Sequence, residues 1–96
     1  MLLKAGVDIS RLERNTRRGL QLVANIFKTY DQELIITSTF EGNHSAGSLH
    51  YANRAFDIRK PTKELKEIAD QVSHLLEPDF DVVDESTHWH IEHDPK

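Results

Sequence analysis

The order of hydrophobic patterns along the chain constrains its fold more than any other feature of the sequence. Between residues 9 and 30, apolar residues recur mostly at three- and four-residue steps, which is the period of an amphipathic helix. A second stripe of this kind follows Thr62, a residue that can cap a helix, and Pro78 stops it. Short segments rich in β-branched or alternating apolar residues are typical of strands, and they occur at 33–39, 54–59, 80–86 and 88–93. The last two are joined by a tight turn or form one bent strand.

This order predicts an α+β domain in which two helices pack on one side of a small antiparallel sheet. A chain of 96 residues builds one modest core, so we expect a single domain over residues 1–96. The segment 33–39 is apolar almost throughout, and we expect it to be a central strand.

Composition and charge exclude several classes of function. No apolar run approaches the roughly 20 residues of a membrane span, and the apolar start of the chain is shorter than the roughly 7–15 residues of a signal-peptide core. The net charge of −4 argues against a nucleic-acid partner, because phosphate binding needs clustered lysine and arginine. The chain has no cysteine, so imidazole and carboxylate groups would have to hold any metal ion. We therefore expect cytoplasmic synthesis and neither a membrane nor a nucleic-acid partner.

Histidine is the unusual component of the sequence, because six occur in the chain and five of them fall in two short segments. Alternate residues of a strand share a face, so His88, His90 and Glu92 should point the same way. A polar strand that faces solvent would explain two histidines equally well. His50 in a loop and Asp57 on the next strand change the balance, because together they add the nitrogen and oxygen ligands that suit a tetrahedral zinc ion.

Two segments resemble a known family. "TSTF...GSLHYANRAFDIR" followed by "ESTHWHIE" is similar to the zinc peptidases that comprise D-Ala-D-Ala carboxypeptidases, D-Ala-D-Ala dipeptidases and phage L-alanyl-D-glutamate endolysins, whose fold recurs in Hedgehog signalling domains. The family pattern is SxHxxGxAxD, followed by an acidic residue shortly before a histidine and frequently by HxH. The matching residues are Ser48, His50, Ala55 and Asp57 in the first motif and Glu85, His88, His90 and Glu92 in the second.

The resemblance implies a Zn²⁺ site held by His50, Asp57 and one histidine of the HxH pair. We take His90 as the third ligand, because a hydrophobic residue and an acid follow it as they follow the family's ligand. His88 would then lie beside the metal and bind a substrate oxyanion or a proton in transit. In a competing alignment, Glu85 and His88 form the family's ExxH pair and His88 is the ligand.

The implied activity is hydrolysis of peptidoglycan stem peptides or other D-amino-acid peptides. Three protein ligands leave zinc a fourth position for water, whose pKa falls to about 7. Glu85, or alternatively Asp84, would take the proton of that water and pass it to the leaving amine. Strict alternation places Asp84 on the face of His88, so Glu85 requires a bulge or turn at Ser86 and Thr87 to re-aim it. We prefer Glu85, because the resemblance places the acid three residues before the first histidine.

Two positions depart from the family pattern. Asn53 stands where the family has glycine, and asparagine is the next best residue for a backbone with positive φ. The family often has an arginine after "TS", where Glu41 is the nearest residue here, although Arg54 or Arg59 could reach the site. The second departure favours an alternative, a zinc-binding structural or interaction module of the same fold that is catalytically weak or inactive. A metal-free binding domain is a third possibility.

The remaining conspicuous residues predict surface or core positions. We expect His44 to be exposed, His74 to be structural or at the surface, His93 to face away from His90, and Trp89 to fill the core. The small size and the lack of a wall-binding module resemble a monomeric phage-type enzyme that reaches the cell wall after membrane breach. The sequence leaves the scissile bond open, whether that of a carboxypeptidase or of an endopeptidase.

Overall fold

The computed structural model describes residues 1–39 and 53–95, which form an α+β fold of two helices and five strands. The predicted order of helices and strands is confirmed, and a short additional strand precedes it. In chain order the elements are β1 (Leu2–Leu3), α1 (Arg14–Thr29), β2 (Ile35–Ser38), β3 (Ala55–Arg59), α2 (Leu65–Leu76), β4 (Phe80–Asp84) and β5 (His88–His93). Within the described residues, neither helix has the length and apolar character that a membrane crossing requires.

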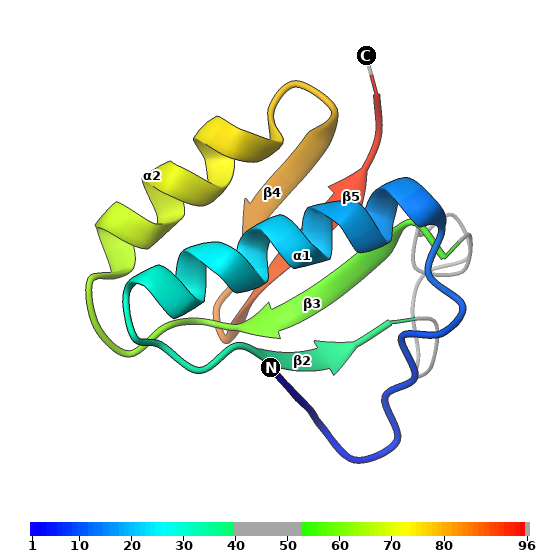
Figure 1. Ribbon diagram of the computed structural model, residues 1–96, viewed down its shortest axis with the longest axis horizontal. Helices are drawn as coiled ribbons and strands as arrows, with labels where there is room; N and C mark the ends of the chain where they lie inside the picture. Colours follow the sequence, from blue (N-terminus) through cyan, green and yellow to red (C-terminus); the bar gives the residue numbers. More distant parts are fainter. Residues whose placement is uncertain (40–52, 96) are drawn as a thin grey trace.

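The strands form one mixed sheet in the order β1-β2-β3-β5-β4 (Figure 1). The pairs β2–β3, β3–β5 and β5–β4 are antiparallel, as predicted, whereas β1 pairs parallel with β2. No sequence pattern predicts β1, because two leucines are too few to show a period. The middle position belongs to β3, in which the residues from Ala55 to Ile58 are all buried, and β2 lies between it and the short edge strand.

Both helices lie on the same side of the sheet and cover it, with α1 crossing over β3 and β5 (Figure 1). Along β3 and β5, residues that face the helices alternate with polar residues. The residues that face the helices are Phe56, Ile58, Trp89 and Ile91. Trp89 is 3% exposed and meets the ring of Phe27 of α1 edge to face, with 6.3 Å between ring centroids. The prediction that Trp89 belongs to the core is confirmed.

The first helix is shorter than its hydrophobic pattern predicts. It begins at Arg14, although Ile9 and Leu12 continue the apolar spacing and also pack against the core. Glu13 has an extended backbone, and its N–H donates to the carbonyl oxygen of Asn53 at 2.8 Å. The preceding segment therefore contributes apolar residues from turns, which a helical period alone cannot distinguish from a first helical turn.

The second helix begins later than predicted, and Thr62 does not cap it. The backbone N–H and the hydroxyl group of Thr62 both lie 3.3 Å from Oε1 of Gln32, a residue of the turn after α1. The helix starts at Leu65 after Glu64, whose backbone is left-handed with a φ of 53°. Thr62 therefore ties the approach to α2 to another part of the chain, a long-range contact that its sequence position does not reveal.

Gly19 lies inside α1 because the ring of Phe80 occupies the space next to it. A Cβ placed on Gly19 would lie 2.5 Å from Cζ of Phe80, a separation at which one of the two groups must move. The helix is continuous through this position, so the glycine does not interrupt it. Its role is the close approach between α1 and the first residue of β4.

We expect Gly19→Ala to destabilise the protein by about 1–3 kcal/mol, because overpacking against Phe80 outweighs the gain of about 1 kcal/mol in helix propensity. Urea denaturation of the two proteins measures the difference. The same substitution in a Phe80→Leu background is the control, and there the loss should be smaller, since leucine can yield. A rise in stability for Gly19→Ala alone would contradict the close contact.

Candidate functional site

The face of the sheet turned away from the helices bears a row of polar side chains. His88, His90 and Glu92 of β5 share this face because the residues between them belong to the core. Asp57 and Arg59 of β3 project to the same side, and the strand register pairs Asp57 with His90 and Arg59 with His88. The shared face of the two histidines and Glu92 therefore follows the predicted alternation.

Asp57 is the centre of this row. Its side chain is 11% exposed, and a carboxylate at this depth needs partners to offset its lost hydration. Oδ1 lies 3.0 Å from Nδ1 of His90, and Oδ2 lies 3.6 Å from Nε2 of His88. The other ring nitrogen of His90, Nε2, lies 2.7 Å from Oε1 of Glu92. The four side chains form a continuous sequence of contacts from His88 through Asp57 and His90 to Glu92.

These contacts raise the pKa of His90 above its ordinary value. The hydrogen bond with Asp57 is the largest cause, burial opposes it, and the hydrogen bond with Glu92 adds to the increase. Without a metal ion, the two carboxylates thus favour a protonated imidazole. A metal ion bound at Nδ1 must displace a proton there, so acid should weaken its binding.

The distance between the donor atoms of Asp57 and His90 is close to that between two neighbouring ligands of a metal ion such as zinc. Zinc bonds to oxygen and nitrogen are about 2.0–2.1 Å long, so neighbouring ligand atoms of a tetrahedral site lie about 3.3 Å apart. The 3.0 Å between Oδ1 of Asp57 and Nδ1 of His90 is close to that separation. His90 is also the less exposed of the two histidines, at 17% against 32% for His88. The third predicted ligand, His50, lies outside the described residues.

Glu85 and His88 face each other across a tight turn. The chain reverses at Ser86 and Thr87, and the N–H of Glu85 donates to the carbonyl oxygen of His88 at 3.0 Å. Because directly opposed residues of a hairpin project to the same side, this turn re-aims Glu85 to the face of His88 without a bulge. The hydroxyl group of Thr87 lies 3.1 Å from Nδ1 of His88 and helps to orient the ring, with Nε2 toward Asp57.

The alternation argument that placed Asp84 on this face is wrong. Asp84 pairs in register with Trp89, an inward residue, because the turn between β4 and β5 resets the alternation from one strand to the next. The carboxylate of Asp84 lies 2.6 Å from Nζ of Lys60 and is largely exposed. Of the two acids considered as the base, Glu85 is the one on the face of His88.

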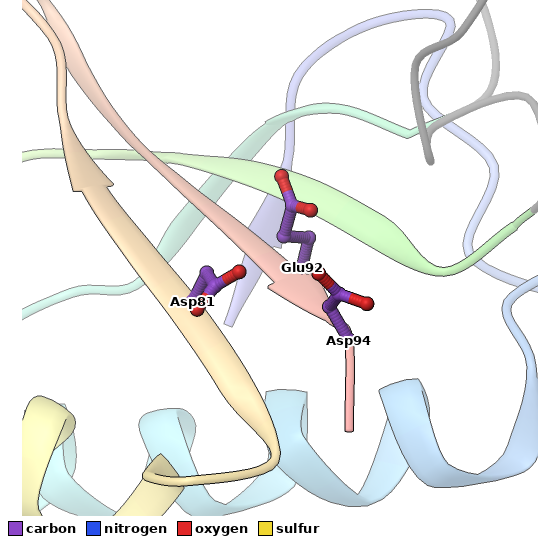
Figure 2. A group of neighbouring side chains, drawn as sticks. All are labelled: Asp81, Glu92 and Asp94. Carbon is purple, nitrogen blue, oxygen red and sulfur yellow. The ribbon is translucent and has the colours of Figure 1, made fainter. Parts of the chain in front are cut away.

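A second group of carboxylates lies at the end of this row. Asp81 is opposite Glu92 in the register, Asp94 follows β5, and one oxygen from each of the three lies within 4.8 Å of the others (Figure 2). Among residues 1–39 and 53–95, these three form the one group of at least three histidine or acidic side chains whose ligand atoms all lie this close together. The chain therefore contains a possible metal-binding group in addition to the Asp57–His90 pair. The sequence analysis missed Asp81 and Asp94, because only the pairing of β4 with β5 brings them together.

The two arginines considered as replacements for the family's arginine lie in different places. Nε of Arg54 lies 3.4 Å from Oε2 of Glu13, beside the start of α1 and on the helix side of the sheet. Arg59 is exposed and opposite His88 on the face of the candidate site. Asn53 has a φ of 59°, which confirms the positive φ expected at the position of the family's glycine.

The other histidines divide between core, surface and undescribed residues. His93 faces the helices, as its parity predicts: its ring lies 4.9 Å from that of Phe80, and Nδ1 lies 3.2 Å from Oε1 of Glu13. His74 is exposed on α2, as predicted. The predictions about Glu41, His44 and Ser48 fall, with that about His50, outside the described residues.

Comparison with models of protein families, with curated proteins and with solved structures finds no match to the chain.

Proposed function

We propose that the protein is a zinc-dependent peptidase that hydrolyses peptidoglycan stem peptides or other D-amino-acid peptides through a metal-activated water. The main support is the contact between Asp57, which is largely buried, and His90: Oδ1 of the carboxylate and Nδ1 of the imidazole lie 3.0 Å apart. His50 completes the ligand set by the sequence resemblance. The scissile bond is that of a carboxypeptidase or of an L-alanyl-D-glutamate endopeptidase.

The residues around this pair have distinct roles in the proposed reaction. Zinc bound there would lower the pKa of a water to about 7. Glu85 would act as the base that takes a proton from this water and passes it to the leaving nitrogen. His88, which lies 3.6 Å from Asp57, is placed to donate a hydrogen bond to the oxyanion that forms on the substrate. Arg59, on the same face, is the described cation best placed for a substrate carboxylate.

Metal binding tests the proposal directly. The purified protein should contain one zinc ion per chain, and Asp57→Ala or His90→Ala should weaken zinc binding by more than about 100-fold, since each removes a ligand. His74→Ala is the matched control, because it removes an exposed histidine on α2 and should leave the zinc content unchanged. Elemental analysis and titration with a competing chelator measure the content and the affinity.

Thermal unfolding provides an independent check on the metal. Zinc at 100 times its Kd should stabilise the native state by about 2.7 kcal/mol, and a chelator should remove this gain. If the wild-type protein binds no stoichiometric zinc and a chelator leaves its melting temperature unchanged, the peptidase proposal fails and a metal-free binding domain takes its place.

A zinc-binding structural or interaction module is the second candidate function. It is favoured by Glu41, which stands nearest the place of the family's arginine. The acidic group of Asp81, Glu92 and Asp94 adds negative charge beside the site, which would oppose binding of an anionic substrate end. Such a module would bind zinc equally well and hydrolyse no peptide.

A further inference from the structure

The contact between His90 and Glu92 is the shortest among the four side chains of the site. Nε2 of His90 lies 2.7 Å from Oε1 of Glu92, whereas the distances to Asp57 are 3.0 Å from His90 and 3.6 Å from His88. The resemblance assigns no role to Glu92 beyond a match to the motif. Its position is nevertheless specific, because it contacts the ring nitrogen of His90 that faces away from Asp57.

A neutral imidazole has one N–H group and one lone pair, and its hydrogen bonds decide which nitrogen has which. With the hydrogen on Nε2, His90 donates to the carboxylate of Glu92 and turns the lone pair of Nδ1 toward Asp57. In either neutral tautomer a lone pair faces one carboxylate, that of Asp57 at 3.0 Å from Nδ1 or that of Glu92 at 2.7 Å from Nε2. Asp57 therefore favours the hydrogen on Nδ1, and Glu92, the closer carboxylate, favours it on Nε2. A zinc ion on Nδ1 would use the lone pair that faces Asp57 and leave the hydrogen on Nε2, where Glu92 accepts it.

We propose that Glu92 is a positioning residue that holds the Nε2–H tautomer of His90 and thereby presents Nδ1 to the metal ion. The inference deepens the proposed function and rests on it, because it takes Nδ1 of His90 as a zinc ligand. A carboxylate that accepts the second N–H of a ligand histidine fixes the ring and strengthens the bond between nitrogen and metal.

The surroundings of Glu92 explain why its side chain turns to His90. Its partner in β3 is Ala55, whose small side chain leaves space on this face of the sheet. Oxygens of Asp81 and Asp94 lie within 4.8 Å of a Glu92 oxygen, and like charges at this distance repel one another. The N–H group of His90 lies 2.7 Å from Oε1 of Glu92, and this contact offsets part of that repulsion.

Three variants separate positioning from charge. Glu92→Ala should weaken zinc binding by about 10- to 100-fold, because His90 then loses the acceptor for Nε2–H. Glu92→Gln should recover most of that loss, since an amide oxygen accepts the same hydrogen bond. Asp94→Asn removes a charge from the same acidic group without touching His90, and it should change the affinity by less than about threefold.

Imidazole ¹⁵N NMR of the metal-free protein, at a pH where His90 is neutral, provides a readout without zinc. The wild type and Glu92→Gln should show more of the hydrogen on Nε2 than Glu92→Ala does, because in Glu92→Ala only Asp57 remains and it favours the hydrogen on Nδ1. The inference is overturned if Glu92→Ala keeps the same tautomer as the wild type, or if Asp94→Asn weakens zinc as much as Glu92→Ala does. Failure of the proposed function looks different: the wild type then binds no zinc, whatever tautomer His90 shows.

Discussion

Glu85→Gln should lower peptide hydrolysis by about 10²- to 10⁴-fold while the protein keeps one zinc ion per chain. Glutamine has the size of glutamate and can still form hydrogen bonds, but it cannot take a proton from water. Glu85 lies opposite His88 at the turn between β4 and β5, on the face of Asp57 and His90. It is exposed and outside the proposed ligand set, so the substitution should leave metal binding unchanged.

The assay needs two kinds of substrate and one control variant. A stem peptide ending in D-Ala-D-Ala reports carboxypeptidase cleavage, and a peptide containing L-Ala-D-Glu reports endopeptidase cleavage. Asp84→Asn is the control, because Asp84 pairs with Lys60 and should lose little activity. If Asp84→Asn is inactive and Glu85→Gln is not, the assignment of the base is wrong. If the zinc-bound wild type cleaves neither peptide, the protein is the structural module instead.

Local patterns predicted the elements of the fold and one face of the site. The order of helices and strands, the burial of Trp89 and the common face of His88 and His90 all follow from periods of two or 3.6 residues. The positive φ of Asn53 was also predictable, because it depends on the residue type and the matching glycine of one short motif. In each case, the information lies within a few neighbouring residues.

Features that depend on pairing between distant segments were not predictable in the same way. The alternation of a strand says nothing about its partner, so the sequence could not show that the turn at Ser86 puts Glu85, and not Asp84, on the face of His88. The group of Asp81, Glu92 and Asp94 exists for the same reason. Proximity of this kind is a property of the strand register, which the whole sheet determines.

The site and the core are linked through β5, because residues of the two faces alternate along it. His88 and His90 are the sequence neighbours of Trp89, and the register places Asp57 and Ile58 of β3 opposite His90 and Trp89. The burial of one face therefore determines where the proposed ligands on the other face lie. This arrangement makes the packing of Trp89 a condition for the geometry of the candidate site.

Trp89→Ala should destabilise the protein by about 3–5 kcal/mol, the usual cost of deleting a buried aromatic side chain. Trp89 is 3% exposed and contacts Phe27 of α1, so alanine would leave a cavity between the sheet and the helix. Proteins of this size are stable by about 5–15 kcal/mol in total, so the expected loss is a large fraction of the free energy of unfolding. Far-UV circular dichroism during urea denaturation measures the loss, because the substitution removes the only tryptophan of the chain and its fluorescence.

Trp89→Phe is the matched control, since it keeps an aromatic ring against Phe27 and should lose clearly less stability than alanine does. Zinc should restore part of the stability of Trp89→Ala if Asp57 and His90 bind the ion, because binding favours the native state. The same addition should not restore a variant that also has His90→Ala. A loss below about 1 kcal/mol for Trp89→Ala would mean that the tryptophan does not join α1 to β5, and the link between core and site would then be wrong.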